Sequence, residues 1–578
     1  MPKIKTDPRT VRQAKHCFDE GELKDFQDDI DYFMETLNSP DATANLKCLS
    51  MINLTKKCAV FEFRKYLRGK LPLFQKLIAT LKDSHETPAL SICVAAFLYM
   101  MARDAAQFPS IGAPLSLIYE FLKQDKINGD SEYQKYQKMA WEIISTWKKD
   151  CEKRKGRKII FDLTEKNMTP AYVSLVTLDY IVARSPTKNQ ALQSELLNTG
   201  ILQSLVAKVD KIVISMRLLQ NPTAETIRQH LSELEHSFRI FENGIMLDKR
   251  NQTFVVGHRQ GSLLFSCEKY LDYFCKEVPN HEIGDNVARQ LFDCLSLMIR
   301  ATMNASHSNE VCAIKLGQIG NFLSNSLHVL SSIIPRFAEK EKLFDLTLLI
   351  CGLLVNLTEK SASNRRKVSN LRCEFFAPIL EEKKPPADSK QPTPNSSQAS
   401  STNGSDASPQ KRECNGPEQL SVLEMLTRVF CRHEEQARSV DEELDNEMFE
   451  EVLEEEEAEG DGSGDENGAT SAANAAGRLT RAPDLNDDEI VSALNSAMQK
   501  ATAHMHDSMI ASYVALLIGC LVQTDETMGD KLRALMPAGN FATLLEQLDR
   551  FREFTVLTKI VDVRCIESII ESLKILDH

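Results

Sequence analysis

Two stretches far apart in the chain decide the fold, Leu49-Ser-Met-Ile-Asn-Leu-Thr55 and Gly352-Leu-Leu-Val-Asn-Leu-Thr358. Each is an apolar run that ends in Asn-Leu-Thr. A basic segment follows within a few residues, Phe61-Glu-Phe-Arg-Lys65 in the first case and Ser363-Asn-Arg-Arg-Lys367 in the second. A buried helix, a tight turn and a further helix, repeated along a chain, is the pattern of armadillo and HEAT solenoids. Weaker copies of the pattern occur at Leu297–Thr302 and Arg250–Gln252.

Helical periodicity surrounds these stretches. From about residue 11 to 380, apolar residues recur at steps of three and four, and Gly, Pro and Asn cluster between the segments. No stretch of comparable length shows the strict alternation of a β-strand. We therefore predict an all-α fold, an elongated HEAT/armadillo-like α-solenoid with a disordered acidic insertion.

Composition divides the chain further, because residues 381–415 are rich in Lys, Pro, Ser, Gln, Asn and Thr and hold almost nothing apolar. The predicted organisation is a disordered N-terminus (1–10), helical repeats (11–380), a disordered insertion (381–417), a helix (418–438), a disordered acidic linker (439–483) and C-terminal helices (484–578).

The charge of the chain is concentrated in one run. The 578 residues carry a formal net charge of −13, and the segment Asp441–Glu466 holds 15 Asp or Glu and no Lys or Arg. Without that segment, 69 basic residues stand against 82 − 15 = 67 acidic ones, a balance of +2. A nearly neutral body argues against a protein whose main partner is a nucleic-acid backbone, so direct nucleic-acid binding is not expected.

The cysteines and the apolar runs exclude several classes of protein. No C-x-x-C occurs among the 15 Cys, which argues against zinc ribbons and thioredoxin-like sites. The charged N-terminus lacks the apolar core of a signal peptide. The longest apolar stretches, Thr347–Val355 and Met509–Val522, fall short of the roughly 20 residues that a membrane span needs. Reduced thiols in the nucleus or cytosol fit best.

Catalytic and nucleotide-binding motifs are missing from the sequence: there is no Walker loop, G-x-G-x-x-G, H-E-x-x-H or G-x-S-x-G. Asp461-Gly-Ser-Gly-Asp465 begins like a calcium loop, but Glu466 and Ala472 stand where Gly and Glu are required. His504 and His506 are two residues apart in a helical region and so point to different sides. We expect no enzyme activity, small-molecule substrate, metal or cofactor.

A basic run follows Trp147 and ends near Lys158. It has three interpretations: a solvated helix end and loop, a nuclear-import signal, or an edge that contacts phosphate. Its candidate residues for import or phosphate contact are Lys153, Arg154, Lys155, Arg157 and Lys158.

Polar residues at the helix turns are a second class of candidates, because repeat proteins present their binding surfaces on such ridges. Each one taken alone is better explained as a capping or salt-bridging residue. As a class they are expected to project from the solenoid, and they comprise Arg64, Lys65, Arg68, Asp104, Asn364, Arg365 and Arg366.

Several blocks of the sequence resemble, in the same order, the C-terminal domain of the Wapl family of cohesin release factors. They are Gly21–Tyr32, Leu46–Ala59, Ser91–Asp104, Gly352–Val368, His504–Leu521 and Leu535–Phe541. The resemblance implies a nuclear, chromosome-associated, non-enzymatic regulator of sister-chromatid cohesion, with a cytoplasmic pool. The implied partners are the cohesin ATPase head, its kleisin and HEAT subunits, and its HEAT-repeat regulator.

The matched blocks also imply partner contacts, and charge reversal at Arg64/Lys65 or Arg365/Arg366 is expected to abolish release without unfolding. Members of the family often carry Phe-Gly-Phe motifs in a long N-terminal half, whereas this chain begins at the folded domain and has none. The alternative is an armadillo-type adaptor that binds peptides or transport cargo. The implied contact residues are Arg64, Lys65, Asp104, Asn364, Arg365 and Met505.

Overall fold

The structure is a computed structural model, and it is helical almost throughout the part of the chain that it describes. The predicted all-α class is confirmed. The chain divides into two compact units, Met1–Gly320 and Asn321–His578, which we call unit 1 and unit 2. The described residues are 8–103, 108, 111–124, 130–155, 163–185, 189–280, 284–376, 416–458, 487–523, 525–558 and 563–577, and of these 8–20, 155, 441–458, 487–501, 503 and 558 are described by their backbone alone.

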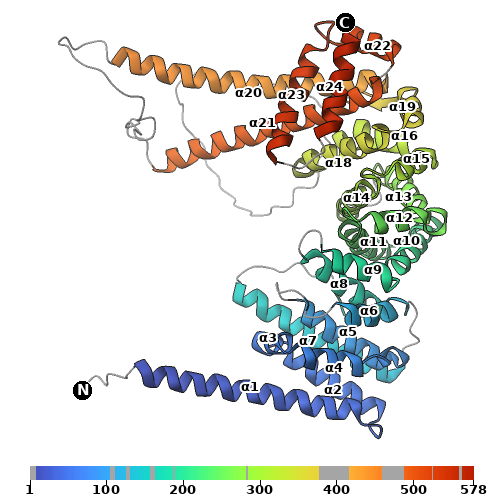
Figure 1. The fold of residues 1–578 in the computed structure, drawn as a ribbon, viewed down its shortest axis with the longest axis vertical. Helices are drawn as coiled ribbons and strands as arrows, with labels where there is room; N and C mark the ends of the chain where they lie inside the picture. Colours follow the sequence, from blue (N-terminus) through green and yellow to red (C-terminus); the bar gives the residue numbers. More distant parts are fainter. Residues whose placement is uncertain are drawn as a thin grey trace, which may run out of the picture. The chain divides into compact units, whose positions relative to one another are not determined.

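Unit 1 consists of helices that follow one another in chain order, from blue α1 to green α14 in Figure 1. They are α1 (Pro8–Asn38), α2 (Ala44–Lys57), α3 (Phe61–Gly69), α4 (Leu71–Thr80), α5 (Pro88–Ala102), α6 (Gly112–Leu122), α7 (Ser131–Lys155), α8 (Pro170–Ala183), α9 (Gln190–Asn198), α10 (Ile201–Leu218), α11 (Ala224–Gly244), α12 (Lys249–Gly257), α13 (Ser262–Glu277), α14 (Asp285–Ser306) and α15 (Glu310–Gln318), with 3₁₀ turns at Ser84–Glu86 and His258–Gln260.

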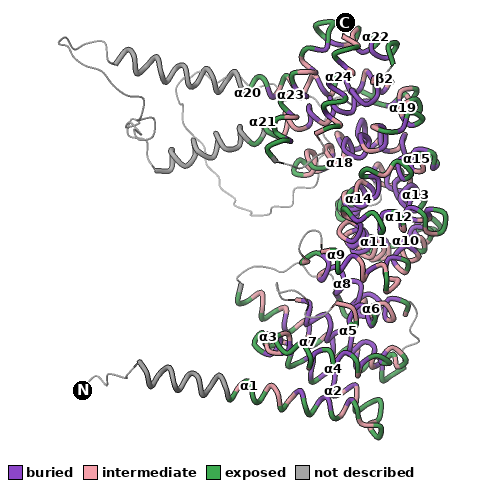
Figure 2. Tube along the Cα trace, viewed as in Figure 1, coloured by how far each residue is buried: buried purple, intermediate pink, exposed green. Residues whose placement is uncertain are grey.

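An inner row runs through unit 1, in which α2, α5, α8, α11 and α14 each pack on the next. Helices α5 and α8 are buried along nearly their whole length, because their sequences are apolar on every side (Figure 2). Polar contacts near the C-terminal ends link successive members of the row. For example, Nη1 of Arg184 donates to the carbonyl of Ala102, and Nδ2 of Asn304 donates to that of Glu242. The C-terminal ends of these helices therefore lie on one side of the row.

A buried charged group joins α8 to α11. Oδ2 of Asp179 lies 2.7 Å from Nδ1 of His236 and also accepts from Nη1 of Arg239. Asp179 and His236 are both buried, so the ion pair with the half-exposed Arg239 compensates the burial of the carboxylate.

Unit 2 is arranged around α21 (Asp487–Val522), which packs on α18, α20, α23 and α24. The ring of His506 stacks on that of Phe344 from α18, with 3.8 Å between centroids. Nδ1 of His433 on α20 lies 2.7 Å from Oδ1 of Asp507. The other elements are α16 (Phe322–His328), a π-turn (Val329–Ile333), α17 (Ile334–Phe337), α18 (Lys340–Thr358), α19 (Ala362–Ser369), β1 (Arg372–Phe375), β2 (Glu418–Ser421), α20 (Val422–Ala458), α22 (Glu526–Leu535), α23 (Ala542–Thr558) and α24 (Val563–Asp577).

A short antiparallel ribbon of β1 and β2 brackets residues 377–415, with Phe375 paired to Glu418. The predicted start of a helix at residue 418 is therefore wrong, because residues 418–421 form β2 and α20 begins at Val422. A capping box fixes that start: Ser421 donates to Oε2 of Glu424, and the amide of Glu424 donates to Oγ of Ser421. The predicted insertion lies outside the described residues except for residues 416 and 417.

The backbone of α20 continues to Ala458, twenty residues beyond the predicted end of this helix at 438. The prediction of disorder is thus wrong for residues 439–458, while 459–486 lie outside the described residues. Glutamate is a good helix former, and that propensity prevailed over the net charge of the run. Helix α1 begins at Pro8, three residues before the predicted start of the folded part at residue 11, and proline is well tolerated at a first helical position.

One stretch of α21, His504–Val522, is long and apolar enough to cross a membrane by length and composition, which is longer than the run read from the sequence. About two thirds of it (67 %) is buried inside the protein. That burial identifies it as the core helix of unit 2.

The crossing of α21 with α24 depends on Gly519. A Cβ atom at this position would collide with Cγ2 of Ile569, so Gly519→Ala forces the two helices apart. We expect it to lower the free energy of unfolding by about 1–3 kcal/mol, as overpacking of a core does. Gly257→Ala is the control, because nothing lies within 4 Å of a Cβ there. Thermal and urea unfolding of both variants measures this, and equal midpoints would contradict the close crossing.

Burial raises the pKa of Glu235 on α11 to about 7, a shift that a hydrogen bond with Gln290 and the charge of His236 partly oppose. Between the ordinary pKa near 4.5 and about 7, the folded chain binds more protons than the unfolded one. The free energy of unfolding should therefore fall as pH rises from 5 to 8. Glu235→Gln should reduce that fall by about 1–3 kcal/mol, an upper range set by 1.36 kcal/mol per pKa unit. Urea titrations at several pH values test this, with the exposed Glu225→Gln on the same helix as the control.

Candidate functional site

The repeat read from the sequence appears in the structure as two matching helix corners. At the start of α19, Nδ2 of Asn364 donates to the carbonyl of Leu357, seven residues earlier, at 2.8 Å. At the start of α12, Nδ2 of Asn251 donates to the carbonyl of Gly244, again seven residues earlier and at 2.8 Å. Both asparagines are buried, and each lies three residues after a capping side chain, Ser361 and Asp248. The predicted likeness of Arg250–Gln252 to the segment that begins at Ser363 is confirmed.

Arginines close the corners after α2 and α18. Nη1 of Arg64 donates to the carbonyl of Cys58, and Nη1 of Arg365 donates to those of Thr358 and Glu359 at 3.0 and 2.9 Å. Both arginines lie four residues after the N-cap of their helix, Val60 for α3 and Ser361 for α19. They satisfy carbonyl groups that a helix end leaves without partners.

The structure corrects part of the predicted surface. Arg64 and Asn364 were expected to project from the ridges and do not, since they are 3 % and 2 % exposed. Arg365 is half-buried, whereas Lys65 is exposed and Met505 is 52 % exposed. The two buried side chains serve to close the corners, which removes them from the accessible surface.

The other predicted residues are placed as follows. Arg366 is exposed beside Arg365, and Arg68 is half-buried on α3. Asp104 lies outside the described residues.

The predicted basic run forms the C-terminal end of α7. Lys153 and Arg154 are exposed there, Lys155 is described by its backbone alone, and Arg157 and Lys158 lie outside the described residues. Burial lowers the pKa of Arg64, and the neighbouring thiols of Cys58 and Cys151 act in the opposite direction. Cys151 belongs to α7, so the thiol near the end of this helix is close enough to α3 to act on Arg64. The two groups of predicted cations in unit 1 are thereby brought to one edge.

Sequence reasoning missed two further arginines on this edge, Arg103 and Arg184. They are the C-caps of α5 and α8, two neighbours in the inner row. A repeated pentapeptide could have identified them: Tyr99-Met-Met-Ala-Arg103 and Tyr180-Ile-Val-Ala-Arg184. In each copy the guanidinium lies over the ring of the tyrosine four residues earlier, with Cζ 5.4 and 5.2 Å from the centroid.

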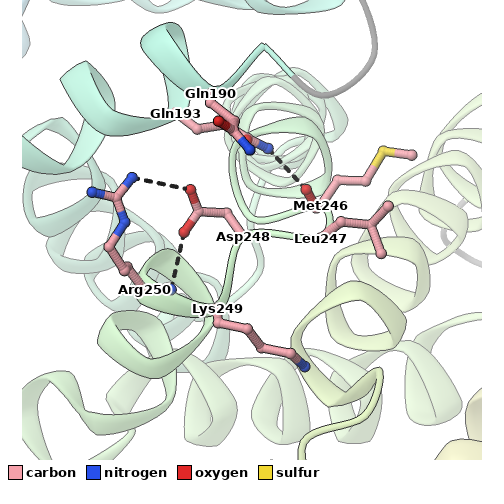
Figure 3. Close-up of a pocket in the computed structure, with 7 residues that line it drawn as sticks. All are labelled: Gln190, Gln193, Met246, Leu247, Asp248, Lys249 and Arg250. Atoms are coloured by element: carbon pink, nitrogen blue, oxygen red, sulfur yellow. Dashed lines mark hydrogen bonds and ion pairs between the residues drawn. The ribbon is translucent and has the colours of Figure 1, made fainter.

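A recess of about 400 Å³ lies at the corner between α11 and α12 (Figure 3). Its polar groups are engaged: Asp248 accepts from the backbone amide and the guanidinium of Arg250, and Nε2 of Gln193 donates to the carbonyl of Met246. Leu247, at its rim, is 52 % exposed and has a φ of 56°. The residues that line the recess include no nucleophile paired with a base, so the recess is a structural corner.

The described side chains offer little for bond chemistry. No group of three or more His, Cys, Asp or Glu among them could hold a metal ion. Burial raises the pKa of the thiols of Cys58, Cys312 and Cys351 to about 12, which keeps them protonated and unreactive at neutral pH. What the structure does offer is an edge of arginines and lysines along α3, α5, α7 and α8, interleaved with aromatic rings.

The chain stacks helix pairs, closes their corners with side chains and presents an edge of cations and rings. These features are typical of helical-repeat scaffold proteins. The sequence then gives the family. A model of the family "Wings apart-like protein regulation of heterochromatin" matches residues 10–364, and the chain belongs to this family.

Three relatives match along nearly the whole chain. They are Wings apart-like protein homolog 1 of Caenorhabditis elegans (32 % identical, 98 % of this chain), Wings apart-like protein homolog of Homo sapiens (26 %, 98 %) and Protein wings apart-like of Drosophila melanogaster (20 %, 99 %). The matches cover 71 %, 47 % and 30 % of those proteins respectively, so the chain spans less than half of the human and fly relatives.

Among solved structures, two crystal structures of Uso1 match with TM-scores of 0.35 and 0.36 at 10 % and 9 % identity. They cover 94 % and 93 % of this chain and 78 % and 77 % of those chains. These TM-scores are too low to define a shared fold.

Arg64 and Lys65 are adjacent on α3, and comparing them tests whether the first stabilises the fold as a cap while the second does not. Arg64→Met leaves the carbonyl of Cys58 without its donor, and we expect it to lower the free energy of unfolding by about 1–3 kcal/mol. Lys65→Met, the matched control, should change it by less than about 0.5 kcal/mol, because this side chain is exposed. Urea unfolding of the two variants gives the comparison, and equal losses would show that Arg64 is no structural cap.

Proposed function

We propose that this chain is a non-enzymatic regulator of sister-chromatid cohesion, which binds cohesin and promotes its release from chromatin in the nucleus. The observation that carries the proposal is membership of the Wings apart-like family, through a family match over residues 10–364 and a relative that is 32 % identical over 98 % of the chain. The proposed partners are the cohesin ATPase head, its kleisin and HEAT subunits, and its HEAT-repeat regulator.

The proposed mechanism is driven by binding. A ligand shifts an equilibrium only by its difference in affinity for the two states, so the scaffold must bind cohesin more tightly when the gate of the ring is open. ATP hydrolysis is assigned to cohesin, and this chain is given no bond chemistry.

The corner geometry narrows the predicted contacts to those that a partner can reach. Lys65 and Arg366 each lie five residues after the N-cap of their helix, directly after the buried Arg64 and the half-buried Arg365. Both are exposed, so these equivalent positions of two repeat corners can meet a partner without loss of a cap. Met505 adds an exposed, adaptable apolar contact on α21.

The experiment combines recovery of partners with a functional readout. Tagged protein is used to pull partners from nuclear extract, and chromatin-bound cohesin is counted after depletion and add-back. We expect cohesin subunits in the eluate, more chromatin-bound cohesin after depletion, and rescue by the wild type. The double variant Lys65→Glu/Arg366→Glu should fail to rescue while unfolding at the wild-type midpoint, because its caps are intact.

Lys138→Glu serves as the control, since it reverses an exposed cation on α7 away from the corners. Full rescue by the double variant would remove these two side chains from the mechanism. Recovery of transport cargo without cohesin, and no change in chromatin-bound cohesin, would contradict the proposal and favour a peptide-binding adaptor.

A further inference from the structure

We propose that Arg103 and Arg184, framed by the rings of Tyr99, Trp147 and Tyr180, form a receptor for carboxylate side chains in an acidic segment of a partner protein. The inference rests on the proposed function, in which the chain acts by binding other proteins, and it names the chemistry of one contact.

Three aromatic rings hold the guanidinium of Arg103. Its Cζ lies 4.1 Å from the ring centroid of Tyr180, 5.3 Å from that of Trp147 and 5.4 Å from that of Tyr99. The rings of Tyr99 and Tyr180 pack edge to face, with centroids 6.0 Å apart. Helices α5, α7 and α8 each supply one ring, so the packing of unit 1 fixes the orientation of the guanidinium. Aromatic faces attract a cation without consuming its N–H donors.

The donors of Arg103 remain available. Its Nε and Nη1 atoms are buried and make no hydrogen bond with the residues that the structure describes. A buried donor without a partner costs free energy, which an incoming acceptor recovers. Carboxylates suit this position, because their two oxygens match the planar fork of a guanidinium.

A second cation lies against the same ring. Cζ of Arg184 is 5.2 Å from the centroid of Tyr180, and its Nη1 donates to the carbonyl of Ala102 at 2.7 Å. Burial lowers the pKa of Arg184, and the charge of Arg103 lowers it further. Two like charges in a partly desolvated place repel, so an anion bound beside both stabilises the pair more than it would stabilise either one alone.

The surroundings favour an acidic protein segment over a nucleic acid. Arginine next to tyrosine and tryptophan is the composition of protein–protein hot spots. The same helix that supplies Trp147 carries the exposed Lys149, Lys153 and Arg154 within its next two turns. These cations would meet further acidic residues of a segment whose first carboxylate lies between Arg103 and Arg184.

The test measures binding of a fluorescein-labelled octaglutamate peptide to the full chain by anisotropy, at low and moderate salt. Arg103→Gln and Arg184→Gln should each weaken binding about tenfold or more, as expected when one partner of a desolvated charge pair is removed. Arg336→Gln is the matched control, because that arginine lies over two rings, 4.6 and 4.3 Å from the centroids of Phe337 and Phe376, and no second guanidinium from the described residues lies over either ring. Its affinity should stay within about twofold of the wild type, a difference of under 0.5 kcal/mol.

Two further comparisons keep the proposal falsifiable. If either variant fails to fold by circular dichroism, Arg103→Lys or Arg184→Lys replaces it, because lysine keeps the positive charge and a donor but loses the planar fork that pairs with a carboxylate. Peptide binding that both variants retain would overturn the proposal. So would single-stranded DNA that binds more tightly than the peptide and is lost with the same two variants, since that result assigns the site to nucleic acid.

Asp104→Asn examines the acidic residue that follows Arg103 in the sequence. If the wild type binds no peptide and this variant does, the chain's own carboxylate occupies the receptor and the proposal is wrong. The assay contains no cohesin, so its outcome is separate from that of the release experiment.

Discussion

Helices that end inside a packed array leave backbone carbonyl groups without intrahelical partners. The packing of this protein depends on how those carbonyl groups are hydrogen-bonded. Side chains from later in the chain supply the missing donors: Arg64 for α2, Arg184 for α5, Asn251 for α11 and Arg365 for α18. Each donor belongs to a later helix or follows one, so satisfying one helix end also positions what comes after it. The hydrogen bonds that cap one helix therefore also hold the next part of the chain against it, so capping and stacking depend on the same interactions.

This arrangement divides the cations of the repeat corners into two kinds. Arg64 and Arg365 donate to backbone carbonyl groups, whereas Lys65 and Arg366, each one residue further on, are exposed to solvent. Adjacent residues on a helix point about 100° apart, so one side chain of each pair faces the helix end and the next faces solvent. Basic character at such a corner is therefore a poor guide to binding until the direction of each side chain is known.

The architecture was predictable because helical burial leaves a period in the sequence, and the Asn-Leu-Thr ends mark where α2 and α18 stop. The sequence could not show that Arg64 is buried and Lys65 exposed, because it does not reveal which residue is the N-cap of α3. The ribbon of β1 and β2 was missed because four residues are too few for a visible alternation. The Tyr-x-x-Ala-Arg repeat was visible, but the third ring, that of Trp147, reaches Arg103 only through tertiary packing.

The pairing of Phe375 with Glu418 sets the two ends of a long segment side by side on the surface of unit 2. Closing a loop costs free energy that grows only with the logarithm of its length, about 0.6 kcal/mol for each doubling. With its ends already paired, the segment between them can lengthen, shorten or change composition over evolutionary time with little effect on the helices beneath. The ribbon therefore holds both ends of this segment at one place on unit 2, whatever the length of the chain between them.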